Sequence, residues 1–431
     1  MRDRLLPAAL ALSLLVTAAG AAAQAPSPAP PAVGSLERLT FDEAVRRAVE
    51  HNPSIGEASQ AILRSQALLA QARAAYLPTL YGAAGTTVLD AARGFDGSIT
   101  QPRTQSAFNA TLSVPVLAAA SWAAKNQAGD QVRIARISAE ETRRQVALTA
   151  AQSYLAVISA ERQREIALRN LDTARALEEY AKARLDAGKG SRLNHVRSTQ
   201  ERATAESRLE LSELLVRRAQ EALGVAIYAP GPVDANGDPS LQTAAPPPDD
   251  AWLAQRPDIR LFSAQEQAAD RVVRDYWTTW VPTARVGFTP QYVTPAGLFE
   301  PAHTWRAFLA LQVPIYDGTL RAAKRLYLAE RETTRIRLDA VKLQARSELR
   351  LAQESVVRTE QIVSASRLAA ESAGEALRIS DIAFRAGATS NIEVVQAQQA
   401  ARQAEVELAV AEDRLRQARL DLLLALGQFP Q

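Results

Sequence analysis

The sequence predicts a mainly α-helical protein with a small β contribution, built from a duplicated unit of helix, two strands, very long helix and shorter helix. Three observations support this fold class. Alanine, leucine, arginine, glutamine and glutamate are abundant and only 5% of the 431 residues are aromatic, a bias typical of long helices. Landmark prolines and glycines recur at a near-constant offset. Short alternating stretches interrupt the helical runs in each half.

The N-terminus reads as a processing segment. Arg2 and Arg4 precede an apolar run and then small residues, which predicts a signal peptide over 1–23. The alternative is a first membrane helix, although the run is short for one. A Pro- and Ala-rich linker, expected to be disordered, follows over 24–38. No later stretch has about 18 apolar residues in a row, so we expect no membrane-spanning helix in the mature chain.

Four landmark pairs recur between the halves: prolines that open helices, prolines that close them, prolines that follow strands, and glycines. The first two pairs lie 204 residues apart and the last two lie 199 apart. They are Pro53 and Pro257, Pro78 and Pro282, Pro115 and Pro314, and Gly188 and Gly387. The landmarks predict a first structural repeat over 39–224, an inter-repeat linker over 225–250 and a second repeat over 251–427.

Each repeat contains a pair of predicted strands. We expect them over about 80–90 and 104–114 in the first repeat, and over about 283–293 and 304–313 in the second. The clearest alternation runs from Phe108 to Val114. It places apolar side chains on one face of the strand and Asn109, Thr111 and Ser113 on the other.

A run of 73 residues without proline separates each strand pair from its glycine, enough for a helix on the order of 100 Å long. Tip turns are predicted over 186–191 and 385–390, and the helices that follow are only about half as long. We therefore expect the short first helix and the returning helix of each repeat to stack end to end along the long one. The strands then lie at one end and the turns at the other.

Four strands per chain do not close a barrel. Two copies would give eight strands, whose interior is filled by side chains or one small ligand, and three would give twelve, enough for a channel. Strand number therefore favours a trimer if the protein conducts anything.

The sequence gives no sign of catalytic, cofactor or metal chemistry. Asp42 and Glu43 follow the possible cap Thr40 and look like first-turn helix acids rather than catalytic carboxylates. The three histidines lie in unrelated segments, so a metal site is not expected; they are His51, His195 and His303. The net charge is only +3 without a polybasic block, which gives no indication of nucleic-acid binding, and the absence of cysteine excludes disulfides.

Several motifs together resemble one family. They are LTFDEAVRRAVEHNPSI near the mature N-terminus, YLPTL before the strands, VPIYDG after them, and the paired Ala-Gly turns. In order and duplication they resemble outer-membrane efflux proteins of the TolC type, from about Leu39 to Leu426. The resemblance implies a homotrimer in which a twelve-stranded β-barrel in the bacterial outer membrane continues into a twelve-helix periplasmic α-barrel. It also implies an exit duct, part of a tripartite efflux pump or type I secretion system, that a periplasmic adaptor connects to an inner-membrane transporter.

The resemblance also assigns candidate site residues. The adaptor-docking tip turns would be formed by Ala187, Gly188, Lys189, Ala386, Gly387 and Ala388. Glu393 stands where family members often carry a pore-gating acid, but Gln396 replaces a second acid, and Thr389 or Ser390 replaces a basic residue. The plainer alternatives are a helix C-cap at each glycine and a helix-start acid at Glu393.

Two further groups of residues have alternative interpretations. The aromatic residues around the strands would form either an interfacial belt or ordinary packing; they are Trp122, Trp277, Trp280 and Tyr316. The first tip is basic, which suits either a solvated turn or contact with an acidic adaptor; its basic residues are Lys189, Arg192, His195 and Arg197.

The leading function is thus a passive outer-membrane channel subunit without enzymatic activity. The alternative is a periplasmic coiled-coil adaptor or scaffold without a pore, although such proteins are expected to carry one hairpin flanked by β-rich domains. A secreted hydrolase lacks a supporting nucleophile–base pair or metal cluster.

Overall fold

The computed structural model describes residues 36–95, 98–241, 250–296 and 301–429. The predicted signal peptide, 1–23, and most of the predicted linker lie outside the described residues. The residues from Glu37 onward form one unit. None of the helices in the described part of the chain combines the length and the apolar character that crossing a bilayer requires.

The predicted duplication is confirmed. The first repeat comprises α1 (Phe41–His51), α2 (Pro53–Ala74), β2 (Thr79–Val88), β5 (Thr104–Leu117), α3 (Ala119–Asp186) and α4 (Arg192–Ala226). The second comprises the 3-10 helix η1 (Asp250–Ala254), α5 (Pro257–Asp275), the 3-10 helix η2 (Tyr276–Trp280), β7 (Thr283–Thr294), β8 (His303–Gln312), α6 (Gly318–Arg385) and α7 (Asn391–Ala425). Both long helices have 68 residues and both returning helices have 35.

The helix starts follow from local sequence. Thr40 caps α1, because its hydroxyl oxygen accepts a hydrogen bond from the Glu43 backbone N–H at 3.4 Å. Asn52 caps α2 in the same way through Ser54 N–H at 2.9 Å, and Pro53 occupies the first turn of that helix. The second half repeats the proline but not the side-chain cap, since Arg256 precedes Pro257 there.

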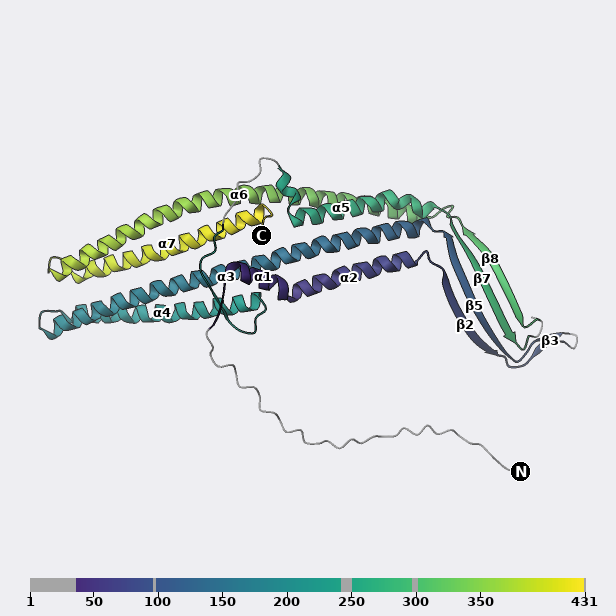
Figure 1. The fold of residues 1–431 in the computed structure, drawn as a ribbon, viewed down its shortest axis with the longest axis horizontal. Helices are drawn as coiled ribbons and strands as arrows, with labels where there is room; N and C mark the ends of the chain where they lie inside the picture. Colours follow the sequence, from purple (N-terminus) through teal and green to yellow (C-terminus); the bar gives the residue numbers. More distant parts are fainter. Residues whose placement is uncertain (1–35, 96–97, 242–249, 297–300, 430–431) are drawn as a thin grey trace, which may run out of the picture. The chain divides into compact units, whose positions relative to one another are not determined.

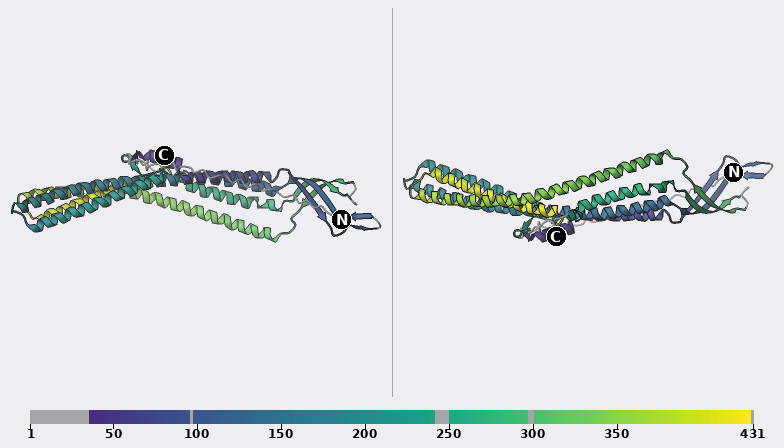
Figure 2. Two further views of the ribbon diagram at one scale, coloured as in Figure 1. Left: turned by 90° about the horizontal axis from the view of Figure 1, so that it is seen from below. Right: turned by 90° about the horizontal axis from the view of Figure 1, so that it is seen from above.

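Each long helix has two partners placed end to end, as the length mismatch predicts. Helices α2 and α4 both pack along α3, and α5 and α7 both pack along α6 (Figure 1). At each junction of the two partners lies a hydrophobic core. The first includes Tyr154, Leu223 and Ile227, and the second includes Trp252, Leu349 and Leu426. The three views agree that the strands lie at one end of these helices and both turns at the other (Figures 1 and 2).

Helix α3 joins the two halves, because it also contacts α5 and α7. Ion pairs reinforce this seam at several levels along the helices. Arg271 of α5 pairs with Asp130 of α3, and Arg260 of α5 pairs with Glu140 of α3 at 2.8 Å. Beside α3, Arg402 of α7 pairs with Glu201 of α4, which also joins the two halves. The helices therefore lie side by side in a fixed spatial order. The end-to-end pair α2 and α4 comes first, α3 is next, the end-to-end pair α5 and α7 follows, and α6 is last.

The four long strands form one antiparallel sheet in the order β2-β5-β7-β8. The central pair, β5 and β7, comes from different repeats, and β2 and β8 are the unpaired edges. Strand β5 is longer than the predicted 104–114 because it continues past Pro115 to Leu117. The β5–β7 register shifts between these two residues, which fits a proline that has no N–H to donate to the ladder.

Two predicted linkers are partly structured. Strand β1 (Glu37–Leu39) lies at the end of the predicted linker 24–38, and it pairs in parallel with β6 (Val233–Ala235) inside the predicted linker 225–250. Arg38 also bonds Asp234 at 3.0 Å. Three-residue strands separated by almost 200 residues leave no periodic pattern, so sequence reading misses them. The loop expected between β2 and β5 likewise contains a small hairpin, β3 (Arg93–Phe95) and β4 (Ser98–Gln101).

Arg256 ties three elements of the second repeat together. Its guanidinium is only 7% exposed and donates to Asp258 at 2.7 and 3.1 Å, to Glu348 of α6 at 2.8 Å and to the Ala425 carbonyl of α7 at 3.4 Å. Burial alone would raise the pKa of Asp258, but the hydrogen bonds and charge of Arg256 outweigh it and hold that pKa below its usual value.

Replacing Arg256 with Met is expected to destabilise the protein by about 2 kcal/mol, because it leaves Asp258 half-desolvated without its partner. Replacing Arg260, whose pair with Glu140 is solvent-exposed, is expected to cost well under 1 kcal/mol. Thermal unfolding followed by circular dichroism compares the two variants. The folded-state pKa of Asp258 is lowered. The ionised carboxylate of Asp258 therefore adds to the free energy of unfolding above about pH 4, and this stabilisation is lost as the pH falls through the lowered pKa. Equal effects of the two variants would contradict the assigned role of Arg256.

Candidate docking and gating site at the hairpin tips

Both hairpin tips reverse the chain through the same backbone motif. Gly188 and Gly387 have φ angles of +70° and +80°, in the left-handed region that glycine adopts without strain. At the first tip Lys189 N–H donates to the Arg184 carbonyl at 2.9 Å, and at the second Ala388 N–H donates to the Ala383 carbonyl at 2.8 Å. This is the Schellman ending of a helix, which satisfies its last carbonyl groups.

The two tips differ beyond the shared glycine. In the first, Gly190 approaches the end of α3 so closely that an added Cβ would lie 2.8 Å from the Leu185 backbone nitrogen. The next residue, Ser191, caps α4 by accepting from Leu193 N–H at 3.2 Å. The second tip carries Thr389 in place of Gly190, so only the first tip requires a second glycine.

Glu393 lies in the first turn of α7 and is exposed. Its carboxylate accepts a hydrogen bond from the Thr389 hydroxyl and another from Ser390 Oγ at 3.4 Å. The predicted gate residue therefore also orders the second tip through these two side-chain bonds, and its charge lies at the helix N-terminus, where the macrodipole favours an acid. Gln396 is exposed on the next turn.

The two tips of one chain are packed against each other. The rings of Tyr180 in α3 and Phe384 in α6 meet edge to face with centroids 5.7 Å apart, and the Arg184 guanidinium lies 5.6 Å from the Phe384 centroid and 5.9 Å from the Tyr180 centroid. Arg184 also donates to the Lys189 carbonyl at 3.3 Å. This cluster places both turns at one end of the molecule, with the six candidate docking residues exposed around it.

The sequence alone does not predict this cluster. Tyr180 and Arg184 share a helix face, but Phe384 belongs to the other hairpin and does not occupy the equivalent position of the repeat. Of the basic residues at the first tip, Lys189 and Arg192 are exposed and His195 is half-buried. In the ranges that the structure describes, no group of three or more His, Cys, Asp or Glu side chains is placed to hold a metal ion.

At the other end of the molecule, the sheet has two chemically different faces. The register places the alternating residues of all four strands on common sides. One face, here called the apolar face, carries no Asp, Glu, Lys or Arg and includes Leu80, Val88, Phe108, Ala110, Leu112, Val114, Val286, Phe288, Pro290, Tyr292, Trp305, Leu309 and Leu311. The opposite, polar face includes Thr79, Thr87, Gln105, Asn109, Thr111, Ser113, Arg285, Thr289, Gln291, Thr304, Arg306 and Gln312. The alternation predicted for Phe108 to Val114 is observed.

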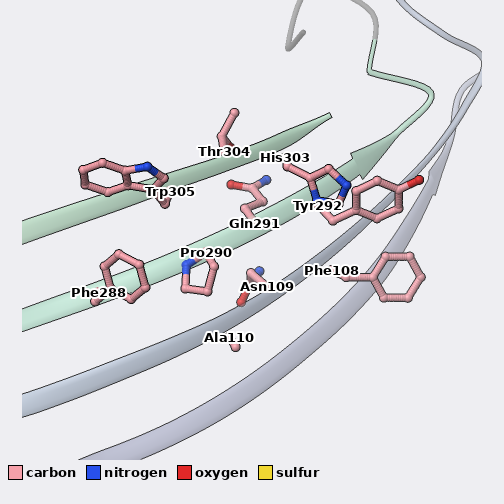
Figure 3. A pocket seen from close by; sticks show the side chains of 10 residues that line it. All are labelled: Phe108, Asn109, Ala110, Phe288, Pro290, Gln291, Tyr292, His303, Thr304 and Trp305. Carbon is pink, nitrogen blue, oxygen red and sulfur yellow. The ribbon is translucent and has the colours of Figure 1, made fainter. Parts of the chain in front are cut away.

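Aromatic rings gather on the apolar face. Phe288 of β7 lies beside Trp305 of β8 with ring centroids 5.9 Å apart, and Tyr292 stacks on His303 at 4.6 Å (Figure 3). In the single chain Trp305 is 71% exposed, and Phe288 and Tyr292 are 42% and 37% exposed. Exposed apolar surface of this extent on an antiparallel sheet marks a surface that contacts lipid or another protein.

The aromatic residues where helices meet strands are also largely exposed. Trp277 is 62% exposed and Tyr316 is 73% exposed, and Trp122 also lies at the surface. Trp280 donates its indole N–H to the Tyr276 hydroxyl at 3.0 Å and is half-buried. Within one chain, only Trp280 therefore fits the packing alternative.

Two long hairpins with exposed tips, joined to a sheet with one apolar and one polar face, define a membrane channel of the helical-tube type. A family model described as "Outer membrane efflux protein" matches residues 44–227 and 250–428. Because these ranges span most of the chain and both repeats, the protein belongs to this family. The resemblance to TolC-type proteins is thereby confirmed, and the chain lies in the bacterial outer membrane and extends into the periplasm.

Solved structures show the same fold. VceC, an outer membrane protein of Vibrio cholerae, is 17% identical, with a TM-score of 0.77 over 90% of this chain and 96% of that one. The CmeC outer membrane channel of Campylobacter jejuni is 14% identical, with a TM-score of 0.79 over 91% and 87%. A membrane protein from Pseudomonas aeruginosa is 20% identical, with a TM-score of 0.81 over 91% of both chains. A comparison with curated protein sequences gives no match.

Proposed function

We propose that three copies of this chain form an exit duct across the outer membrane. The observation that supports this best is the four-stranded sheet with two unpaired edges, one apolar face and one polar face. Open edges in a membrane leave backbone groups unsatisfied, so the sheet must close with copies of itself. Three copies place β8 of one beside β2 of the next and give twelve strands, with the apolar face toward lipid and a polar lumen.

The helices extend this closure into the periplasm. Helices α2 and α4 form one edge of the helical layer and α6 forms the other, so each copy meets the next through unlike edges, as ring formation requires. The resulting tube holds cargo away from the periplasm without performing chemistry on it. Transport is passive, and the free energy comes from an inner-membrane transporter, which an adaptor connects to the tips.

The adaptor role of the tips rests on their geometry. Both turns are exposed, lie at the same end and are held in one arrangement by the Tyr180–Arg184–Phe384 cluster. A rigid, exposed pair of turns suits recognition by a periplasmic helical partner, because little conformational entropy is lost on binding. We assign docking to the six residues of the two turns, and pore gating to Glu393.

Conductance across a planar bilayer tests the duct directly. The purified protein is expected to give uniform, stepwise openings and to migrate as a heat-modifiable complex from outer-membrane fractions. A protein that fractionates with the soluble periplasm and gives no conductance would instead support the scaffold alternative.

Replacing Glu393 with Gln is expected to lower the preference of the channel for cations, because three carboxylates around the tip opening attract them. The matched control is Glu371→Gln, which removes an exposed charge from α6 several turns from the tip. Reversal potentials in a potassium chloride gradient measure both variants. Unchanged ion selectivity in Glu393→Gln would contradict the gating role, and Glu393 would then serve only to stabilise the second tip through Thr389 and Ser390.

A further inference from the structure

The strands of the main sheet carry only two charged residues of the Asp, Glu, Lys and Arg type. These are Arg285 in β7 and Arg306 in β8, and both lie on the polar face. Strands β2 and β5 contribute none. The proposed lumen wall is therefore neutral apart from two guanidinium groups of the same sign.

Neither arginine is neutralised by a described neighbour. Both side chains are exposed, and no ion pair joins either one to another residue that the structure describes. Arg285 lines a hollow on the polar face together with Thr79, Tyr81, Ser113, Phe308 and Gln312. The Arg306 guanidinium lies 5.9 Å from the Phe308 ring centroid, which is a cation–π contact and leaves its charge unpaired.

The two arginines lie at different levels of the sheet. Arg285 pairs across the ladder with Ala310, four residues along β8 from Arg306, so the two levels are about 13 Å apart along the strand. Closing the barrel brings β2 of a neighbouring copy to the β8 edge, and β2 adds no charge. Three copies thus give two rings of three guanidinium groups in a neutral wall.

We propose that the barrel section is an anion-attracting filter, and that the cargo class it favours is organic anions bearing carboxylate, sulfonate or phosphate groups. This inference rests on the proposed duct. Charges of one sign in a channel with low-dielectric walls raise the local concentration of the opposite ion. Guanidinium groups donate paired hydrogen bonds to planar oxyanions. Tyr81 and Phe308 beside Arg285 offer apolar surface to the rest of such a molecule.

The sign of this filter is opposite to that proposed for the tip at Glu393, so the test must address the barrel separately. Protein added to one chamber of a planar bilayer leaves its polar helical tube on that side, and the barrel opens to the other chamber. Citrate, a trivalent anion, is therefore added to the far chamber. We expect it to reduce the conductance of the native protein, whereas the trivalent cation hexaamminecobalt(III) at equal concentration should have little effect there.

The double variant Arg285→Gln/Arg306→Gln is expected to raise the half-blocking citrate concentration by about tenfold or more, since six positive charges are lost per trimer. The matched variant Arg285→Lys/Arg306→Lys keeps the charge and should retain most of the block. If the double glutamine variant fails to insert, each single glutamine variant should give an intermediate increase in the half-blocking citrate concentration.

Two results would overturn the filter while stepwise conductance still supports the duct: citrate does not block the native protein, or citrate blocks the glutamine variants equally well. Loss of all conductance in the native protein would instead contradict the duct itself.

Discussion

Replacing Ala110 with Arg should abolish outer-membrane assembly, whereas replacing the neighbouring Asn109 with Arg should leave it largely intact. The two residues are adjacent near the middle of β5, but they lie on opposite faces of the sheet. Ala110 is on the apolar face beside Pro290, and Asn109 is on the polar face opposite Gln291 (Figure 3). An arginine facing lipid near the bilayer midplane costs about 2–4 kcal/mol, and three copies carry it.

The measurement is the yield of heat-modifiable complex in isolated outer membranes, compared with total protein. We expect the Ala110→Arg yield to fall by at least about tenfold, since a cost of 1.4 kcal/mol already corresponds to that factor. Equal loss in both variants would mean that the strand tolerates no arginine on either face. Equal assembly in both would contradict contact between the apolar face and lipid.

Replacing Gly387 with Val should leave assembly intact and sharply reduce export. At φ +80° an L-residue is strained by roughly 1–2 kcal/mol, and a β-branched side chain suffers most. Apart from the adjacent residues of the chain, no described atom lies within 4 Å of the position of an added Cβ, so the effect is confined to the backbone of one exposed turn. The barrel and the hydrophobic cores are remote from it.

The matched control is Gly387→Asn, because asparagine adopts the left-handed region with little penalty. It should keep export near the native level, which separates turn geometry from added bulk. The test combines trimer yield with a cargo-export or drug-susceptibility assay in a strain that lacks the native gene. Full export by the valine variant at normal trimer levels would mean that no partner recognises the tip and that the glycine only ends α6.

Much of the fold is predictable because its determinants are local. Proline at the first turn of α2 and α5 and glycine after α3 and α6 act on their own segments, so their spacing shows the repeat. The mismatch between 68-residue helices and 35-residue partners also predicts the end-to-end stacking before any contact is known.

The remaining features depend on pairings between distant segments. The β1–β6 pair joins residues almost 200 positions apart, and the Tyr180–Phe384 contact joins two hairpins. That Arg285 and Arg306 share a face follows only from the β7–β8 register, because a shift by one residue would place them on opposite faces. The tip turns were predictable as turns, but the bonds from Thr389 and Ser390 to Glu393 required the geometry of the second tip.

The mass of the complex extracted in mild detergent tests the closed-barrel duct most directly. Four strands per chain need partners, and only a ring of several copies provides both a closed sheet and a lumen. We expect native mass spectrometry to give three times the mass of the mature chain, with no smaller species at equilibrium. A stable monomer or dimer would contradict the duct, because neither provides twelve strands.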